Sequence, residues 1–310
     1  MTDKLSIIVP CYNEEAAIPL FYQTVQKIKP QLKQVELEYW FINDGSSDNT
    51  LNELRNLNLS DPQHVHYASF SRNFGKEAGL FCGLQQATGN LVVVMDVDLQ
   101  DPPELLPQML ELIRSGNYDC VGTRRTNRKN EPPIRSFFAK LFYRLINRIS
   151  DTPIIDGARD FRMMNRQMID AILSVQEYNR FSKGIFSWVG FRTTYLEYTN
   201  IERQAGQTSW NFWSLFKYSI DGIVAFSEIP LDLAAIVGFI SCLGSGIAIV
   251  WIILRALLYG DPTAGWPSIV CFILFVGGIQ LFCLGIVGKY IGKIFLEVKH
   301  RPIYLIQEKK

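Results

Sequence analysis

The stretch Leu91-Val-Val-Val-Met-Asp-Val-Asp-Leu-Gln-Asp-Pro-Pro103 decides the fold. Residues 91–95 are apolar and rich in valine, and so short a run is typical of a buried strand rather than a helix. The strand leads directly into Asp96, Asp98 and Asp101. Ligands of open parallel sheets bind beyond the carboxyl ends of the strands, where oxygen ligands suit Mg²⁺ or Mn²⁺ on a phosphate. A solvated acidic turn with Asp101 as a helix cap fits the same residues.

Apolar strands alternate with helical patterns on both sides of this stretch, from residue 5 to residue 122. This alternation predicts a doubly wound α/β sheet. The sequence has neither Gly-x-Gly-x-x-Gly nor Gly-x-x-x-x-Gly-Lys-Ser/Thr, so it lacks the dinucleotide and P-loop motifs. Strands are expected at 5–9, 39–43, 66–70, 91–95 and 120–122, and helices near 14–29, 48–57, 75–87 and 103–115.

The overall composition limits the classes of function. A chain of 310 residues with 48% hydrophobic content has a sizeable core, and its net charge of +1 gives no indication of nucleic-acid binding. The six cysteines form no Cys-x-x-Cys pair, and the three histidines lie far from any acid or cysteine at metal-ligand spacing. Both observations favour reduced, packed thiols over a disulfide framework or a zinc site. The N-terminus has no signal-peptide pattern, so the first domain is expected in the cytoplasm.

Two later segments, 233–254 and 262–288, contain no charged residue. Each exceeds the roughly 20 residues that cross a bilayer, which predicts transmembrane helices at about 233–254 and 267–288. Lys289 and further basic residues follow the second span, whereas the turn at 260–267 between the spans has no Lys or Arg. The positive-inside rule then predicts a multi-pass protein of the inner membrane with both termini in the cytoplasm. A buried hairpin in a soluble protein is the alternative.

Two segments before these spans have the composition of membrane-surface helices. In residues 134–149 apolar and aromatic residues recur at steps of three and four, and Arg or Lys residues occupy the opposite side. Residues 210–227 begin with a Trp, Phe, Lys and Tyr mixture that is typical of headgroup depth. A core-facing helix of a soluble domain would give a pattern similar to 134–149.

Five motifs in order resemble one known family. The chain is similar to the inverting family 2 glycosyltransferases, and more narrowly to the polyisoprenyl-phosphate glycosyltransferases, which include dolichyl-phosphate mannose synthase and the bactoprenol glucosyltransferases. The resemblance covers nearly the whole chain and implies a GT-A-like doubly wound sheet domain, interfacial amphipathic helices and a two-helix transmembrane hairpin. The motifs are Pro10-Cys-Tyr-Asn-Glu14, Asn43-Asp-Gly-Ser-Ser-Asp48, Gly75-Lys76-Glu77, Asp96-Val-Asp-Leu-Gln-Asp101 and Asp160-Phe-Arg-Met163.

The resemblance also implies roles for particular residues at a nucleotide-sugar site. Asp98 and Gln100, with Asp96, would hold Mg²⁺ or Mn²⁺ on the diphosphate, where a cation neutralises the charge of the leaving group. Glu14 and Asp48 fit the first turns of the following helices equally as caps. The residues expected around the nucleotide are Pro10, Tyr12, Glu14, Asp44, Lys76 and Asp96.

The acceptor implied by the resemblance is a polyprenyl phosphate, in a bacterium undecaprenyl phosphate. Asp160, with Asp156 as second choice, is expected to orient or deprotonate the attacking phosphate oxygen. A phosphate monoester is largely ionised at neutral pH, so a positioning role for Asp160 is equally open. Arginine side chains match phosphate oxygens, and the candidates are Arg162 and Arg203 first, then Arg124 and Arg159.

The expected organisation follows from these assignments. Residues 1–130 would bind the nucleotide sugar, 131–229 would form the acceptor region, 230–294 the two spans, and 295–310 a cytoplasmic tail. The donor would be UDP-glucose or UDP-N-acetylglucosamine, and the product would serve modification of a cell-envelope glycan. Membrane lipids, a small flippase and further copies of the chain are the expected partners, and nucleic acid is not.

Two other functions fit parts of the sequence. A processive polysaccharide synthase shares the nucleotide-binding half, but such enzymes carry Gln-x-x-Arg-Trp and more membrane helices than the two expected here. A membrane-anchored partner without catalysis would have no need for Asp96, Asp98 and Gln100.

Overall fold

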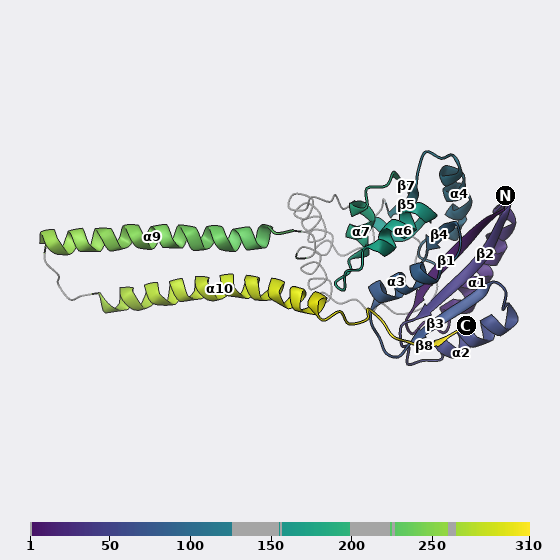
Figure 1. The fold of residues 1–310 in the computed structure, drawn as a ribbon, viewed down its shortest axis with the longest axis horizontal. Coiled ribbons are helices and arrows are strands. Elements are labelled where there is room, and N and C mark those ends of the chain that lie inside the picture. Colours follow the sequence, from purple (N-terminus) through teal and green to yellow (C-terminus); the bar gives the residue numbers. More distant parts are fainter. Residues whose placement is uncertain (1, 126–154, 156, 199–223, 225–226, 260–264) are drawn as a thin grey trace. The chain divides into compact units, whose positions relative to one another are not determined.

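A mixed β-sheet is the frame of the first of two units, Met1–Gly222 with Arg301–Lys310; the second unit is Ile223–His300. The structure is a computed structural model that describes residues 2–125, 155, 157–198, 224, 227–259 and 265–310. Eight strands lie within the described residues, in the order β7-β5-β6-β4-β1-β2-β3-β8 (Figure 1). They are β1 (Asp3–Cys11), β2 (Val35–Asn43), β3 (Val65–Phe70), β4 (Leu91–Val94), β5 (Cys120–Arg125), β6 (Ala158–Asn165), β7 (Thr193–Tyr198) and β8 (Ile306–Lys309).

The direction of the strands places the functional motifs at one edge. β1 is parallel to both β2 and β4, whereas β6 is antiparallel to β4. Cys11 at the end of β1 pairs with Asn43 at the end of β2, and the backbone N–H of Met95 donates to Ile8 at 3.0 Å. The polar residues that follow β1, β2 and β4 therefore meet at the carboxyl edge of the sheet, where open α/β sheets bind ligands.

Helices cover both faces of the sheet, as the alternation of strands and helices predicts. Alternate residues of β1, such as Leu5 and Ile7, point into a core shared with Phe21 of α1 and Met109 of α4. The residues of β2 and β3 that point the opposite way pack against α3. The helices are α1 (Ala17–Ile28), α2 (Thr50–Ser60), α3 (Lys76–Gln86), α4 (Leu106–Arg114), α6 (Arg166–Ser174) and α7 (Ser182–Trp188), with short 3₁₀ turns at Lys29–Gln31 and Pro103–Leu105.

A glycine sets the distance between α3 and the sheet. A Cβ on Gly83 would lie 2.2 Å from Cγ2 of Ile8, which is far inside van der Waals contact. The absence of a side chain therefore allows α3 to approach β1 closely. Since Lys76 is the first residue of α3, this packing also fixes where the Lys76 side chain starts.

The sheet extends further along the chain than expected. All five predicted strands and all four predicted helices form. The segment 131–229, which the sequence separates from the first domain, adds β6 and β7 to the same sheet. Residues 295–310, expected as a tail, contain β8. The boundaries at 130 and 295 are therefore not boundaries of this sheet.

Side-chain contacts as well as backbone hydrogen bonds attach β8 and the residues before it to β3 and its neighbours. It runs antiparallel to β3, and Glu308 accepts hydrogen bonds from Nε of Arg55 at 3.0 Å and from the hydroxyl of Tyr67 at 2.5 Å. The ring of Tyr304 stacks on Phe70 with 4.9 Å between centroids. Buried aromatic pairs of this kind contribute roughly 0.5–1.5 kcal/mol beyond the area they bury.

The second unit consists of two long apolar helices, α9 (Ile229–Tyr259) and α10 (Trp266–Val298). They contact each other, and the Tyr290 hydroxyl donates to the carbonyl of Ser227 at 2.6 Å. Within them Ile229–Ala248 and Phe275–Val298 are long and apolar enough to cross a membrane. Large side chains such as Phe239, 65% exposed, face outward in the structure, which contains no membrane. At 1.5 Å per residue each helix is longer than the roughly 30 Å hydrocarbon layer.

Candidate active site

Two loops at the carboxyl edge of the sheet hold each other through asparagine and serine side chains. Asn13, which follows β1, has the left-handed φ of +56°, a conformation that asparagine tolerates. Its Oδ1 accepts from the backbone N–H of Ser47 at 2.9 Å, and its own N–H donates to Oγ of Ser46 at 2.9 Å. The N–H of Glu14 donates to Oγ1 of Thr50 at 2.9 Å. The motif after β1 is therefore tied to the motif after β2.

The nucleotide-binding candidates of these loops have different environments. Tyr12 is 46% exposed, as a residue available for stacking on a base would be. Pro10 and Glu14 are half-buried. Oδ1 of Asp48 accepts from the N–H of Thr50, the first residue of α2, at 3.0 Å. This bond matches the helix-cap alternative for Asp48.

Asp44 clamps the loop that leads into α3. Its two carboxylate oxygens accept from the backbone N–H of Phe74 at 2.6 Å and of Gly75 at 2.9 Å. Burial raises the pKa of Asp44 above its ordinary value, although these two hydrogen bonds oppose the rise. Asp44, expected to contact the nucleotide, thus also fixes the backbone just before Lys76.

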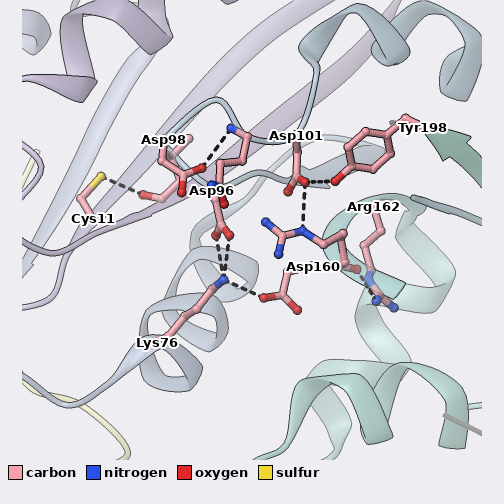
Figure 2. A network of polar contacts seen from close by, with 11 residues as sticks. Cys11, Lys76, Asp96, Asp98, Asp101, Asp160, Arg162 and Tyr198 are labelled. Atoms are coloured by element: carbon pink, nitrogen blue, oxygen red, sulfur yellow. Dashed lines mark hydrogen bonds and ion pairs between the residues drawn. The ribbon is translucent and has the colours of Figure 1, made fainter. Parts of the chain in front are cut away.

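Lys76 lies between two carboxylates that are far apart in the sequence. Its Nζ is 2.7 Å from Oδ1 of Asp96 and 2.6 Å from Oδ2 of Asp160 (Figure 2). The Lys76 side chain is 37% exposed, whereas those of Asp96 and Asp160 are 23% and 17% exposed. The structure therefore joins three of the predicted site residues in one ion-pair network.

The charges in this network set the protonation of Asp160. Burial alone raises the pKa of Asp160, but Lys76, Lys183 and Arg162 outweigh burial and hold the pKa well below its usual value. Burial lowers the pKa of Lys76, and the two carboxylates reverse that effect and raise it. At neutral pH both groups are charged. A carboxylate with a depressed pKa is a weak general base, so this geometry favours a positioning role for Asp160.

The loop after β4 presents the metal-binding candidates in a strained turn. Asp98 is 6% exposed, and its Oδ1 accepts from the backbone N–H of Gln100 at 3.1 Å. Leu99 between them has a φ of +55°, which costs a residue with a Cβ about 1–2 kcal/mol. The buried side chain of Leu99 and the contacts of Asp101 hold this turn in place.

Asp96, Asp98 and Gln100 provide the hard oxygen donors that fit Mg²⁺ or Mn²⁺. Within the described part of the chain, no three His, Cys, Asp or Glu residues group as ligands of an ion. A site with one or two carboxylates is nonetheless what these metals use when substrate phosphates complete the shell. Asp98 and Gln100, with Asp96, are the residues that would hold such a cation, and Asp96 also pairs with Lys76.

The arginines expected to hold the acceptor phosphate have structural partners. Nε of Arg159 pairs with Oδ1 of Asp101 at 3.0 Å, and Nη1 of exposed Arg124 lies 3.8 Å from Glu197. Arg162 is 3% exposed and its guanidinium stacks over Phe186 at 3.9 Å. Arg203 and Asp156 lie outside the described residues. Of the three candidates that the structure describes, Arg124 is the most accessible.

Sequence reasoning missed several contacts that shape the site, including the residues Tyr198 and Ser182. The Tyr198 hydroxyl donates to Oδ1 of Asp101, which is 1% exposed (Figure 2). Burial raises the pKa of Asp101, although the charge of Arg159 opposes the rise. Glu77 accepts from the backbone N–H of Ser182, the first residue of α7, at 2.9 Å. No sequence pattern links these residues, because the partners lie on separate elements.

Comparison with known proteins settles the family. Residues 6–173 match the model described as Glycosyl transferase family 2. The chain belongs to this family. It is 43% identical to a bactoprenol glucosyl transferase of Shigella phage SfV over 307 residues, which is 99% of each chain. It is 42% identical to the prophage bactoprenol glucosyl transferase homolog of Escherichia coli (strain K12), again over 99% of each chain.

As a family 2 glycosyltransferase, the chain has the enzyme class and the GT-A-like sheet domain that its motifs predict. Among solved structures, the mannosyltransferase PcManGT from Pyrobaculum calidifontis in complex with GDP-Man and Mn²⁺ is similar at 15% identity and a TM-score of 0.48. That similarity covers 94% of this chain and 88% of the other. A match at that TM-score adds nothing to the assignment.

Proposed function

We propose that this glycosyltransferase moves one sugar from a UDP-sugar to undecaprenyl phosphate at the cytoplasmic face of the membrane, with glucose as the first candidate for the sugar. The observation that carries the proposal is the identity of 43% to a bactoprenol glucosyl transferase over 99% of both chains. That match includes the two long apolar helices as well as the sheet domain.

The residues of the carboxyl edge would take the following parts. Pro10, Tyr12 and Glu14 would contact the base and ribose, and Asp44 would hold the loop in front of Lys76. Asp98 and Gln100, with Asp96, would hold the divalent cation, which supplies neutralisation of the charge on the departing diphosphate. Either Mg²⁺ or Mn²⁺ fits this donor set.

In the proposed reaction an oxygen of the acceptor phosphate attacks C1 of the sugar from the face opposite the diphosphate. The C1–O bond to the diphosphate breaks with its electron pair, and the configuration at C1 inverts. The attacking oxygen needs no base, because the second pKa of a phosphate monoester is about 6. Asp160 would therefore orient Lys76 and the acceptor rather than remove a proton. Asp156 is the second candidate for this positioning role.

The acceptor phosphate needs cationic partners near Asp160. The sequence ranks Arg162 and Arg203 first, followed by Arg124 and Arg159. Because Arg159 pairs with Asp101 and Arg162 is buried, we place Arg124 ahead of these two. Segment 131–229 would place the acceptor at headgroup depth through the helices expected at 134–149 and 210–227, of which 134–149 and almost all of 210–227 lie outside the described residues.

The proposal includes a membrane topology and partners. Both termini would be cytoplasmic, because Lys289, Lys293 and Lys299 follow the span expected at 267–288. Accessibility of single cysteines in the 260–264 turn to an impermeant thiol reagent would test this orientation. Labelling of that turn from the cytoplasmic side would contradict it. A small flippase and association between copies of the chain belong to the same proposal.

The deciding experiment is transfer of radiolabel to undecaprenyl phosphate in detergent from UDP-glucose, UDP-N-acetylglucosamine and GDP-mannose, with and without Mn²⁺ or Mg²⁺. We expect a labelled lipid only with a metal ion, and loss of it in Asp98→Ala. Asp170→Ala, which removes a 65% exposed carboxylate on α6, is the matched control and should keep full activity. Label in polymer would indicate a polysaccharide synthase, and no transfer from any donor would indicate a non-catalytic partner.

A further inference from the structure

A buried junction joins the loop after β4 to two strands that come later in the chain. Oδ1 of Asp101 accepts from the hydroxyl of Tyr198, the last residue of β7, and from Nε of Arg159 on β6 at 3.0 Å. Asp101 is 1% exposed, and its Oδ2 has no hydrogen-bond partner among the residues the structure describes. The carboxylate is therefore held from one side only, by these two donors.

This junction lies next to the strained part of the loop. Leu99, two residues before Asp101, has a φ of +55°, and Asp98 and Gln100 on either side of it are the metal-binding candidates. A residue such as leucine, which has a Cβ, keeps a left-handed conformation only when its surroundings enforce it. Leu99 is itself buried in the core, so the loop is fixed at Leu99 by packing and at Asp101 by hydrogen bonds. Loss of the second attachment would let the turn relax.

We infer that Tyr198 and Arg159 are positioning residues that act through Asp101 to hold Asp98 and Gln100 in the geometry that binds the divalent cation. The inference rests on the proposed function. It extends that function by linking the metal-binding loop to the strand that carries Asp160. Arg159 is adjacent to Asp160 on β6, so the strand that carries the acceptor-side carboxylate also supports the donor-side loop. Neither Tyr198 nor Arg159 then needs to touch the donor or the acceptor.

The test uses the full chain purified in detergent and measures Mn²⁺ binding by electron paramagnetic resonance, with and without UDP. Tyr198→Phe removes one hydroxyl and leaves the ring in place. Groups that orient metal ligands typically contribute about 10–100-fold to metal affinity, so we expect Mn²⁺ binding to weaken by about tenfold or more. The Michaelis constant for Mn²⁺ should rise by a similar factor, while that for undecaprenyl phosphate stays within about twofold.

Tyr195→Phe is the matched control, because Tyr195 lies on the same strand and packs against Gly122. The described residues offer its hydroxyl no hydrogen-bond partner, so Mn²⁺ affinity should stay within about twofold of wild type. Asp101→Asn keeps the shape of the side chain but removes the charge that Arg159 faces, and it should also weaken Mn²⁺ binding. It provides the second test if Tyr198→Phe does not fold.

The outcomes separate this inference from the proposed function. Wild-type Mn²⁺ affinity in a folded Tyr198→Phe or Asp101→Asn variant would overturn the inference and leave the proposed function intact. Failure of the wild type to bind Mn²⁺ with or without UDP would overturn the metal site itself, and the inference with it. A thermal melt of each variant establishes that the protein compared is folded.

Discussion

Replacing Lys76 with methionine should destabilise the sheet domain by removing a cation from between two carboxylates. Nζ of Lys76 is 2.7 Å from Asp96 and 2.6 Å from Asp160, so both carboxylates lose a charged hydrogen-bond partner and are left to repel each other. Methionine retains the length and apolar stem of lysine. The effect therefore reports the charge rather than the packing of the side chain.

The magnitude follows from the exposure of the three groups. Breaking a fully buried pair costs about 3–5 kcal/mol and a surface pair at most about 1 kcal/mol. Lys76 is 37% exposed and its partners 23% and 17%, so solvent screens part of the interaction. We expect a loss of about 2 kcal/mol, which for a unit of this size lowers the melting temperature by about 4–8 °C.

A double-mutant cycle with Asp160→Asn isolates the interaction. Measured by thermal unfolding in detergent at pH 7 without divalent ions, the double variant should be more stable than the sum of the single effects predicts, by at least about 1 kcal/mol. Lys27→Met, which removes an exposed lysine of α1, is the control and should leave the melting temperature unchanged. Strict additivity of Lys76→Met and Asp160→Asn would refute the ion-pair network.

Three further predictions concern other parts of the structure. Hydrogen bonds from Arg55 and Tyr67 lower the pKa of Glu308 to about 2, so the contribution of Glu308 to stability is complete above its ordinary pKa and is lost as the pH falls toward 2. Glu308→Gln should therefore flatten the acidic part of a plot of melting temperature against pH, and an unchanged plot would contradict the contact. Gly83→Ala would place a Cβ 2.2 Å from Cγ2 of Ile8 and should destabilise by about 1–3 kcal/mol in a thermal melt, and Gly83→Ala/Ile8→Ala, which removes that Cγ2, should lose less than the sum of the two single variants; a wild-type melt of Gly83→Ala would contradict the close packing. Removal of divalent ions with EDTA should abolish sugar transfer and added Mn²⁺ should restore it, whereas transfer that persists in EDTA would exclude the metal role of Asp98 and Gln100.

The parallel centre of the sheet could be predicted because its signals are local. Each of its strands is a short apolar run bounded by polar residues, and the run 91–95 cannot be taken for a helix because it is too short. β6 and β7 carry charged and polar residues within them, such as Arg162 and Glu197, which hides the alternation of a strand. β8 pairs with a strand more than 230 residues earlier, and no local pattern reports such a pairing.

The composition of the site could be predicted, but not its internal contacts. The motifs identified Lys76, Asp96 and Asp160, yet only the fold brings Nζ of Lys76 between carboxylates that lie 20 and 84 residues further along the chain. The same holds for Tyr198, which has no motif of its own and is recognised only by its contact with Asp101. Sequence patterns report residue type and spacing, whereas ion pairs and hydrogen bonds between elements depend on tertiary packing.

The place of β8 in the chain has a consequence for biogenesis. A ribosome completes α9 and α10 before it makes β8, so the nascent sheet presents β3 as an open edge while the apolar helices are being synthesised. Open strand edges pair readily with other chains, which makes this interval the time of greatest risk for aggregation. The sheet can add its last strand only after both helices have been translated. Folding of the sheet domain is therefore completed after the synthesis of the helices.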